Sequence, residues 1–239
     1  YVTDTFFSQI YVIDLTTNQV VGQPVSAGEG VNLATHGVVV SPAGDKVYVA
    51  NENGQSVSQI ILGDKTITTD DVVTEIPVAG DYTGGIAISP NGRYLYVAHI
   101  PLDYPFRSVL TVIDTDPPET ATEDFPVVDS ITLEDGTLTN QPFDIKVSPD
   151  GTKLYISNRQ ANAIYVVNTN ALLGSVELDA KIPVGNDPHG LAVSADGLLL
   201  YVANTEDNTV SVVDPALEPS LAEVAIIDVG LLPWRVVTS

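Results

Sequence analysis

The stretch VVVSPAGDKVYVAN, from Val38 to Asn51, decides the fold. It holds an apolar run, a turn with Pro and Gly, and a second apolar run, which is typical of a β-hairpin. Three copies follow: IAISPNGRYLYVAH at 86–99, IKVSPDGTKLYISN at 145–158 and LAVSADGLLLYVAN at 191–204. The equivalent tyrosines, spaced by 48, 59 and 46 residues, are Tyr48, Tyr96, Tyr155 and Tyr201. A repeat of this period indicates a protein built from similar stacked units.

Each unit holds two more predicted strands after the hairpin. The third strand is IYVID at 10–14, with equivalents at 57–61, 110–114, 164–168 and 210–214. The fourth ends near glycine, and no helical periodicity persists. Four short antiparallel strands per unit predict an all-β fold, a β-propeller. We expect one domain, 1–239, with five blade units at about 1–30 plus 234–239, 35–80, 83–136, 141–186 and 188–230.

The two ends of the chain complement each other in this pattern. Residues 1–4 align with the middle of a second strand, and residues 234–239 align with a first strand. We therefore expect one blade to be shared between the N- and C-terminus, which closes the ring and removes exposed sheet edges. A segment of a larger propeller fits the same pattern, because propellers have roughly four to eight blades.

Composition narrows the functional classes. The 239 residues include 31 acidic and nine basic ones, so the formal net charge is −22. Recognition of phosphates needs clustered Lys and Arg, so no nucleic-acid partner is expected. No run of 18 apolar residues occurs, which argues against a membrane span. The chain has no cysteine and no methionine, even at position 1, which predicts a processed product or a segment of something longer. The low content of charged residues predicts a secreted, cell-surface or periplasmic protein.

The repeated motif resembles a known family. Ser-Pro-x-Gly-x-x-φ-Tyr-Val-Ala-Asn, followed by Asn-Thr-Val-Ser-Val-Val-Asp at 208–214, is similar to the YVTN-type β-propeller repeat. The resemblance extends over nearly the whole chain and implies a surface-layer or secreted propeller. Related propellers serve as scaffolds, adhesins, lactonases and redox subunits, so the fold alone does not choose a function.

The three histidines form the first candidate metal site. His36 and His189 both begin the first strand of a unit, and His99 ends a second strand, so all three are expected on one face. Imidazoles at a channel mouth could bind a transition metal such as copper or zinc, or act as acid and base. No His-x-x-x-His spacing supports a local site, and a histidine at a strand start can equally bond to backbone of the neighbouring blade.

An acidic connection in the third unit is the second candidate. Asp114, Asp116 and Glu119 could supply oxygen ligands to calcium, although the spacing lacks the central glycine of an EF-hand loop.

Other residues are singled out because they break the repeat. The long connection at 99–107 carries Tyr104, Phe106 and Arg107, and the last strand carries Trp234 and Arg235. These five are the candidate ligand- or partner-binding residues. Phe143, Asp144 and Lys146 also replace small or aliphatic residues, and Asp144 is expected to pair with Lys146 or Arg235 in the channel.

No catalytic set stands out in the sequence. Gly-x-Ser-x-Gly is absent, and the repeated serines precede turns. We therefore expect a non-catalytic extracellular or cell-surface propeller, a structural and protein-interaction module that binds protein partners or cell-surface components. Two alternatives remain. One is a periplasmic metal-dependent redox or hydrolytic propeller with a His-lined channel mouth. The other is a glycan-binding propeller that uses Trp234, Tyr104 and Phe106.

Overall fold

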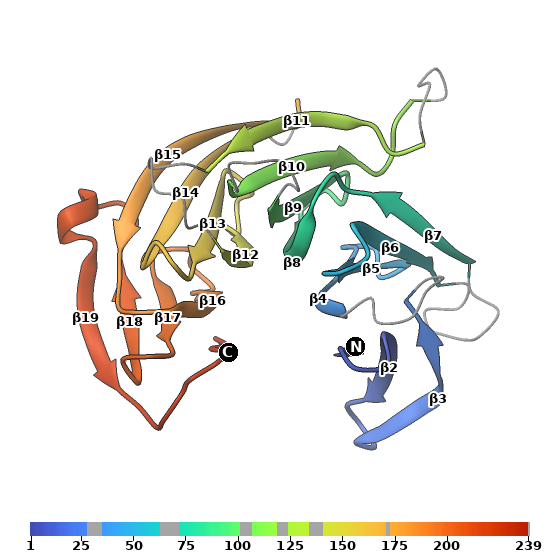
Figure 1. The fold of residues 1–239 in the computed structure, drawn as a ribbon, viewed down its shortest axis with the longest axis horizontal. Coiled ribbons are helices and arrows are strands. Elements are labelled where there is room, and N and C mark those ends of the chain that lie inside the picture. The colour runs from blue at the N-terminus through green and yellow to red at the C-terminus, as the bar shows by residue number, and fades with distance from the viewer. Residues whose placement is uncertain are drawn as a thin grey trace.

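Five antiparallel sheets are arranged side by side around an arc (Figure 1). The computed structural model describes residues 1–27, 35–62, 72–100, 107–118, 124–133, 141–170 and 173–238. Four sheets have four strands each, and the N-terminal sheet has three in the described residues. The prediction of an all-β, propeller-like fold with four-stranded antiparallel sheets is confirmed. Among the described residues, no helix is long and apolar enough to cross a membrane.

The strands follow one another outward in each sheet. The first sheet comprises β1 (Val2–Asp4), β2 (Gln9–Asp14) and β3 (Gln19–Ser26). The second comprises β4 (Thr35–Val40), β5 (Lys46–Asn51), β6 (Ser56–Ile61) and β7 (Val72–Pro77). The third comprises β8 (Asp81–Ile88), β9 (Tyr94–Ile100), β10 (Val109–Asp114) and β11 (Val127–Thr132). The fourth comprises β12 (Pro142–Val147), β13 (Lys153–Asn158), β14 (Ala163–Asn170) and β15 (Ser175–Pro183). The fifth comprises β16 (Pro188–Val193), β17 (Leu200–Asn204), β18 (Thr209–Val213) and β19 (Glu223–Asp228), with a short 3-10 helix, η1 (Pro219–Leu221), before β19.

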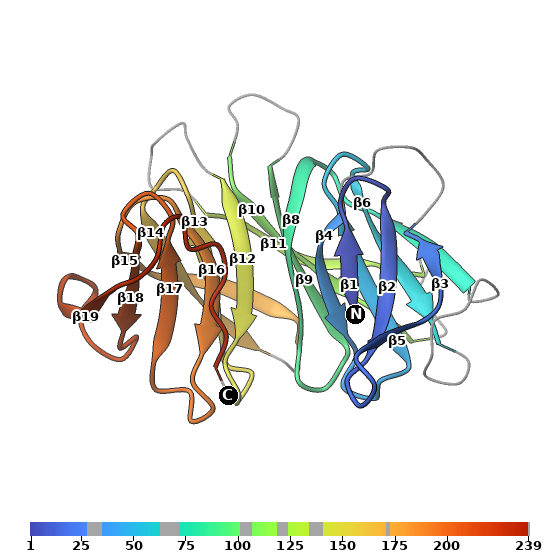
Figure 2. The same cartoon turned by 90° about the horizontal axis from the view of Figure 1, so that it is seen from below.

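The repeated Ser-x-x-Gly turn joins the two inner strands of each four-stranded sheet. In the second sheet the Gly44 amide donates to the Ser41 carbonyl (2.8 Å), and Gly44 has φ +71°. Ser41 Oγ accepts from the Lys46 amide (3.0 Å), which holds the start of β5 against the turn. Glycine is the residue that reaches this left-handed conformation without steric cost. The four such turns, at 41–44, 89–92, 148–151 and 194–197, lie on one face of the arc, called here the turn face (Figure 2). The opposite face, where the inner strands begin, is called the mouth face.

The repeated tyrosines pack between neighbouring sheets. Tyr48 is fully buried and lies in a cluster with Ile86, Leu95 and Val97 of the third sheet. Tyr155 is 2% exposed and packs in the same way on residues of the fifth sheet. Because aromatic side chains bury large apolar areas, these contacts join each sheet to the next.

The predicted closure of the ring is wrong. The C-terminal segment, residues 234–238, lies along β16, where the Gly190 amide donates to the Trp234 carbonyl (3.1 Å) and Thr238 Oγ1 donates to the Val193 carbonyl (2.8 Å) (Figure 2). It thus takes the place of an inner strand next to the fifth sheet, and does not pair with β1. The arc stays open between the first and fifth sheets (Figure 1). The sequence pattern identifies an inner strand, but it does not say which neighbour that strand contacts.

Each inner strand is irregular where it begins. The pairing register shifts between Thr35 and Val38 in β4, and between Pro142 and Ile145 in β12. Equivalent shifts occur in β8 and β16. Irregularities of this kind change the direction of side chains and are frequent beside active sites. Here they fall on the residues that surround the centre of the mouth face.

Candidate active site

One repeat position supplies a ring of side chains at the mouth face. The repeat position near the start of each inner strand is held by His36 in β4, Gly84 in β8, Phe143 in β12 and His189 in β16, and its equivalent in the C-terminal segment is Trp234. Phe143 lies at the centre, with ring centroids 6.2 Å from His36, 4.6 Å from His189 and 5.7 Å from Trp234. All three contacts are edge-to-face, the geometry that the aromatic quadrupole favours. Gly84 has no side chain, so space remains beside Phe143.

A second repeat position, the residue that follows the second strand, completes the ring. His36 Nε2 lies 2.9 Å from Oε2 of Glu52, at this position in the second sheet. Both side chains are partly exposed, at 26% and 20%. When the imidazole is neutral, its Nε2–H donates to the carboxylate and Nδ1 keeps a lone pair. An imidazole oriented in this way by a carboxylate can accept a proton at Nδ1.

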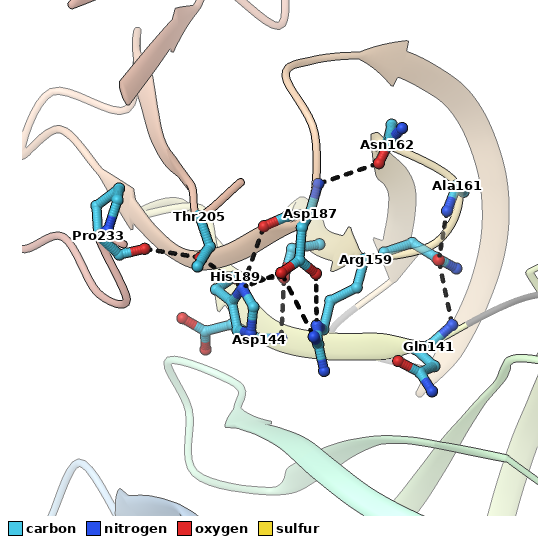
Figure 3. Close-up of polar contacts among 11 residues, drawn as sticks. Gln141, Asp144, Arg159, Ala161, Asn162, Asp187, His189, Thr205 and Pro233 are labelled. Atoms are coloured by element: carbon cyan, nitrogen blue, oxygen red, sulfur yellow. Dashed lines mark hydrogen bonds and ion pairs between the residues drawn. The ribbon is translucent and has the colours of Figure 1, made fainter. Parts of the chain in front are cut away.

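The same position in the fourth sheet is Arg159. Its Nε donates to Asp187 Oδ1 (2.8 Å) and its Nη2 to Asp187 Oδ2 (3.4 Å), which fixes the guanidinium plane (Figure 3). The Asp187 amide in turn donates to Asn162 Oδ1 (3.1 Å). The Arg159 guanidinium also lies 5.8 Å from the centre of the Phe143 ring. Guanidinium has five N–H donors, so the pair with Asp187 leaves others for a ligand.

His189 is held in one tautomer. Its Nδ1 lies 2.6 Å from Thr205 Oγ1 and 3.1 Å from the Asp187 carbonyl, while Thr205 Oγ1 donates to the Pro233 carbonyl (2.7 Å) (Figure 3). Since the single hydroxyl proton goes to Pro233, Nδ1 of His189 must carry its own proton. Burial lowers the pKa of His189, whose side chain is fully enclosed. Nε2 is buried without a hydrogen-bond partner among the described residues.

A cavity of about 130 Å³ lies beside Phe143 at the mouth face. Its walls are His36, Glu52, Gly84, Ile100, Gln141, Pro142, Phe143, Arg159 and Trp234. A more open hollow of about 430 Å³ adjoins it, and the two share Gln141 and Arg159. The combined site offers a carboxylate-oriented imidazole, a fixed cation and an aromatic wall. Such a set can deliver water to an electrophilic carbon and stabilise the negative charge that forms.

Four of the residues singled out from the sequence meet in this site: His36, Phe143, His189 and Trp234. Asp144 pairs with Lys146 as expected (2.6 Å), and its Oδ2 accepts from the Leu191 amide. Arg235 is exposed beside Trp234.

His99 is not brought to the other two histidines. Its Nε2 lies 2.9 Å from Thr111 Oγ1 inside the third sheet, and the residue is 3% exposed. The equivalent pair in the second sheet is Asn51 Nδ2 with Ser58 Oγ (2.8 Å). His99 therefore takes the place of a structural asparagine.

The other metal and ligand candidates lie elsewhere. Asp114 is bound by Arg93 through Nε and Nη2 (3.1 and 2.8 Å), and the Asp116 amide donates to Asp114 Oδ1. Arg107 is exposed, two residues before β10 begins. Glu119, Tyr104 and Phe106 lie outside the described residues. Within the described ranges no three His, Asp or Glu side chains come close enough together to hold a metal ion.

Glu52, Gln141, Arg159, Asp187 and Thr205 were missed by the sequence reasoning. The sequence held a signal for three of them, Glu52, Arg159 and Thr205. The position after the second strand reads Thr5, Glu52, Ile100, Arg159 and Thr205, so it varies in charge and size while the asparagine before it recurs. In a regular repeat, a position whose residue type changes from unit to unit is a candidate for function, and here that position lies at the mouth-face site.

Residues 106–218 match the family model described as "Lactonase, 7-bladed beta-propeller". The match covers the fourth sheet and parts of the third and fifth, and includes Gln141, Phe143, Arg159, Asp187 and His189. His36, Glu52 and Trp234 lie outside it. A comparison with curated proteins finds no match to this chain.

Solved structures share the fold at low sequence identity. A Pseudomonas aeruginosa periplasmic gluconolactonase is 19% identical, with a TM-score of 0.68, over 93% of this chain and 64% of that chain. A putative 6-phosphogluconolactonase from Bacteroides fragilis is 15% identical, with a TM-score of 0.72, over 95% and 66%. A protein from Lactobacillus plantarum is 18% identical, with a TM-score of 0.74, over 95% and 66%. This chain thus spans about two thirds of the length of these structures.

These matches correct two predictions made from the sequence. The family model that matches is that of lactonase propellers, so the assignment to the YVTN-type repeat family, and with it the surface-layer assignment, is wrong. The prediction of a non-catalytic structural and protein-interaction module is also wrong, because the same findings favour a hydrolytic propeller. The repeated hairpin is common to many propellers, which is why it identified the fold and misassigned the family.

Proposed function

We propose that this protein hydrolyses lactones at the mouth-face site. The observation that carries the proposal is the His36–Glu52 pair, which shares one cavity with Arg159 in a chain that matches a lactonase family model. A lactonase needs a base for water, a donor for the carbonyl oxygen and a wall for the ring. His36, Arg159 and the Phe143–Trp234 pair are placed to supply these three.

The proposed reaction begins with water between His36 and the lactone carbonyl. His36 Nδ1 takes one proton from water as the oxygen attacks the carbonyl carbon, and Glu52 stabilises the imidazolium that forms. The Arg159 guanidinium, with the Gln141 amide beside it, donates to the oxyanion of the tetrahedral intermediate. When the intermediate collapses, the ring C–O bond breaks and the imidazolium returns its proton to the leaving alkoxide. The products are the hydroxy acid and a restored neutral His36.

The substrate class proposed is the lactone of a sugar acid. Two of the similar structures are described as a gluconolactonase and a putative 6-phosphogluconolactonase, which supports this choice. Polar groups in the adjoining hollow, including Asn162 and Asp187, can bind the hydroxyl groups of such a ring. The flat faces of Phe143 and Trp234 can pack on its C–H surface.

A substrate panel tests this reaction class. Glucono-1,5-lactone, an unsubstituted δ-lactone and an acyclic ester would be compared by following acid release in a pH-stat. We expect glucono-1,5-lactone to be opened well above the buffer rate, and Glu52→Gln to lower kcat roughly 10-fold or more, because the imidazolium loses its partner. His99→Asn is the matched control, since His99 lies outside the site. Equal rates for Glu52→Gln and the parent protein would overturn the role of the pair.

The number of blades in the complete ring is also a proposal. The family description counts seven blades, and the five sheets here form an open arc (Figure 1). We propose that they correspond to five consecutive blades of such a ring, with the C-terminal segment as the inner strand of the next blade. A location outside the cytoplasm, as the sequence suggests, stays a prediction.

A further inference from the structure

A second pocket lies on the turn face, between the fourth and fifth sheets and away from the mouth-face site. Its volume is about 310 Å³. The hairpin turns of the two sheets contribute Asp150 and Asp196 to its wall, and Tyr155 adds an aromatic side chain. Pro149, Leu198 and Pro215 add apolar surface. Apolar walls with a few convergent polar groups are typical of small-molecule sites.

Tyr155 is the first observation that points to a ligand. The residue is only 2% exposed, yet it lines the pocket, and its hydroxyl has no hydrogen-bond partner among the described residues. The equivalent Tyr48 hydroxyl accepts a bond from Gln59 Nε2 (3.1 Å). Opposite Tyr155 the partner strand carries Val166, which cannot bond. A tyrosine hydroxyl at the wall of a pocket is therefore left for an occupant.

The two aspartates are the second observation. Ser148 Oγ and the Thr152 amide donate to Asp150 Oδ1 (2.6 and 3.0 Å). Ser194 Oγ and the Leu198 amide donate to Asp196 Oδ1 (2.5 and 3.1 Å). The hydrogen bonds found in the described part of the chain thus use one oxygen of each carboxylate, and Oδ2 remains. These bonds hold the pKa of both carboxyl groups below its usual value, so both are anionic at neutral pH.

The local charge selects the class of ligand. Lys153 also lines the pocket, but its ammonium is neutralised by Asp179 Oδ2 (2.8 Å) and bonded to Asn168 Oδ1 (3.0 Å). No Lys or Arg in the described ranges forms an ion pair with Asp150 or Asp196, so their negative charges are not balanced in this way. A cation is therefore favoured, and the apolar walls favour one with a hydrocarbon body.

We infer that the pocket between the fourth and fifth sheets binds a small organic cation, a primary amine with a compact apolar group. Its ammonium would donate to Asp150, Asp196 and the Tyr155 hydroxyl, and its apolar group would pack on Pro149, Leu198 and Pro215. The inference does not depend on the proposed lactonase activity, because the two sites share no residue.

Calorimetric titration with cyclohexylamine, at neutral pH and low ionic strength, tests the inference. Cyclohexanol is the matched neutral probe, and calcium chloride is the inorganic cation. We expect saturable binding of the amine, at least roughly fivefold weaker binding of the alcohol, and loss of affinity with added salt. Equal affinity for the alcohol, binding of calcium in place of the amine, or no binding at all would each overturn the inference.

The variants are chosen so that the fold is kept. Asp150→Asn has a natural precedent at Asn91, whose Oδ1 accepts from Ser89 Oγ (2.6 Å) and the Arg93 amide (3.1 Å) in the equivalent turn. We expect Asp150→Asn and Asp196→Asn each to weaken amine binding roughly fivefold, and Tyr155→Phe roughly threefold. Asp228→Asn, exposed on β19 and outside the pocket, should leave it unchanged. An equal effect of Asp228→Asn would show that only overall charge matters, which contradicts a built site.

Discussion

The buried side chain of His99 makes the stability of the whole fold sensitive to acid. Burial lowers its pKa to about 4, from an ordinary value of 6.5. Between these values the unfolded chain binds a proton that the folded chain does not. The free energy of unfolding is therefore complete above pH 6.5 and falls as the pH drops toward 4, by about 3 kcal/mol in total.

Replacing His99 with asparagine should remove this part of the acid sensitivity. Asparagine occupies the same position in Asn51 and Asn158, and it can bond to Thr111 as Asn51 bonds to Ser58. We expect the loss of stability between pH 7.0 and 4.5 to be smaller in His99→Asn by roughly 2 kcal/mol. Urea unfolding of both proteins at the two pH values measures it. An equal loss in both proteins would show that His99 is not the group responsible.

His189 should report its own protonation through Trp234. Trp234 is the single tryptophan of the chain, and its ring centroid lies 4.1 Å from that of His189. A protonated imidazole at that distance quenches indole emission. Because burial lowers the pKa of His189, we expect quenching with a midpoint below pH 6.5. His189→Gln should abolish the transition. A midpoint at or above pH 6.5, or a transition that persists in the variant, would contradict this assignment.

At the scale of elements, the position of the C-terminal segment depends on one glycine. A Cβ added at Gly190 would lie 2.7 Å from Arg235 Cα and 2.9 Å from the Trp234 carbonyl oxygen, closer than packed atoms approach. Gly190→Ala should therefore displace residues 234–238, expose further the Trp234 side chain, which is already 51% exposed, and destabilise the protein by roughly 1–3 kcal/mol. A red shift of Trp234 emission and thermal unfolding measure the two effects.

Gly230→Ala is the matched control for that substitution. Gly230 precedes the same segment, and a Cβ there meets no atom within 4 Å. This variant should keep the emission of the parent protein. If both glycine variants behaved alike, close packing of the segment on β16 would not be what holds it.

The hairpins were predictable from the sequence because they depend on local chemistry. Ser41, the glycine three residues later and the apolar residues around them fix the turn and both strands without help from the rest of the chain. The contact between residues 234–238 and β16 was not predictable, since it depends on which inner strand comes to lie beside Gly190. The mouth-face site was found only in part for the same reason. His36 and Trp234 occupy a recognisable position of the repeated first strand, whereas Glu52 and Arg159 lie just beyond the second strand, where the repeat pattern does not predict the direction of a side chain.

At the scale of the whole molecule, the charge of −22 affects stability. Only nine basic residues are available to balance 31 acidic ones, so like charges repel one another in the compact state. Salt screens this repulsion over about 10 Å at 0.1 M. We expect the melting temperature to rise by several degrees between roughly 10 mM and 0.5 M sodium chloride. A melting temperature that falls with salt would instead indicate that ion pairs such as Arg93–Asp114 dominate.

The central claim is that the mouth-face cavity opens lactone rings with His36 as the base. The most direct measurement is the initial rate of glucono-1,5-lactone hydrolysis by the parent protein, His36→Gln and His99→Asn, each corrected for the buffer reaction. We predict a catalysed rate for the parent protein and for His99→Asn, and a loss of roughly 100-fold or more in kcat for His36→Gln. A rate for His36→Gln equal to that of the parent protein, or no catalysis of any lactone by the parent protein, would contradict the account.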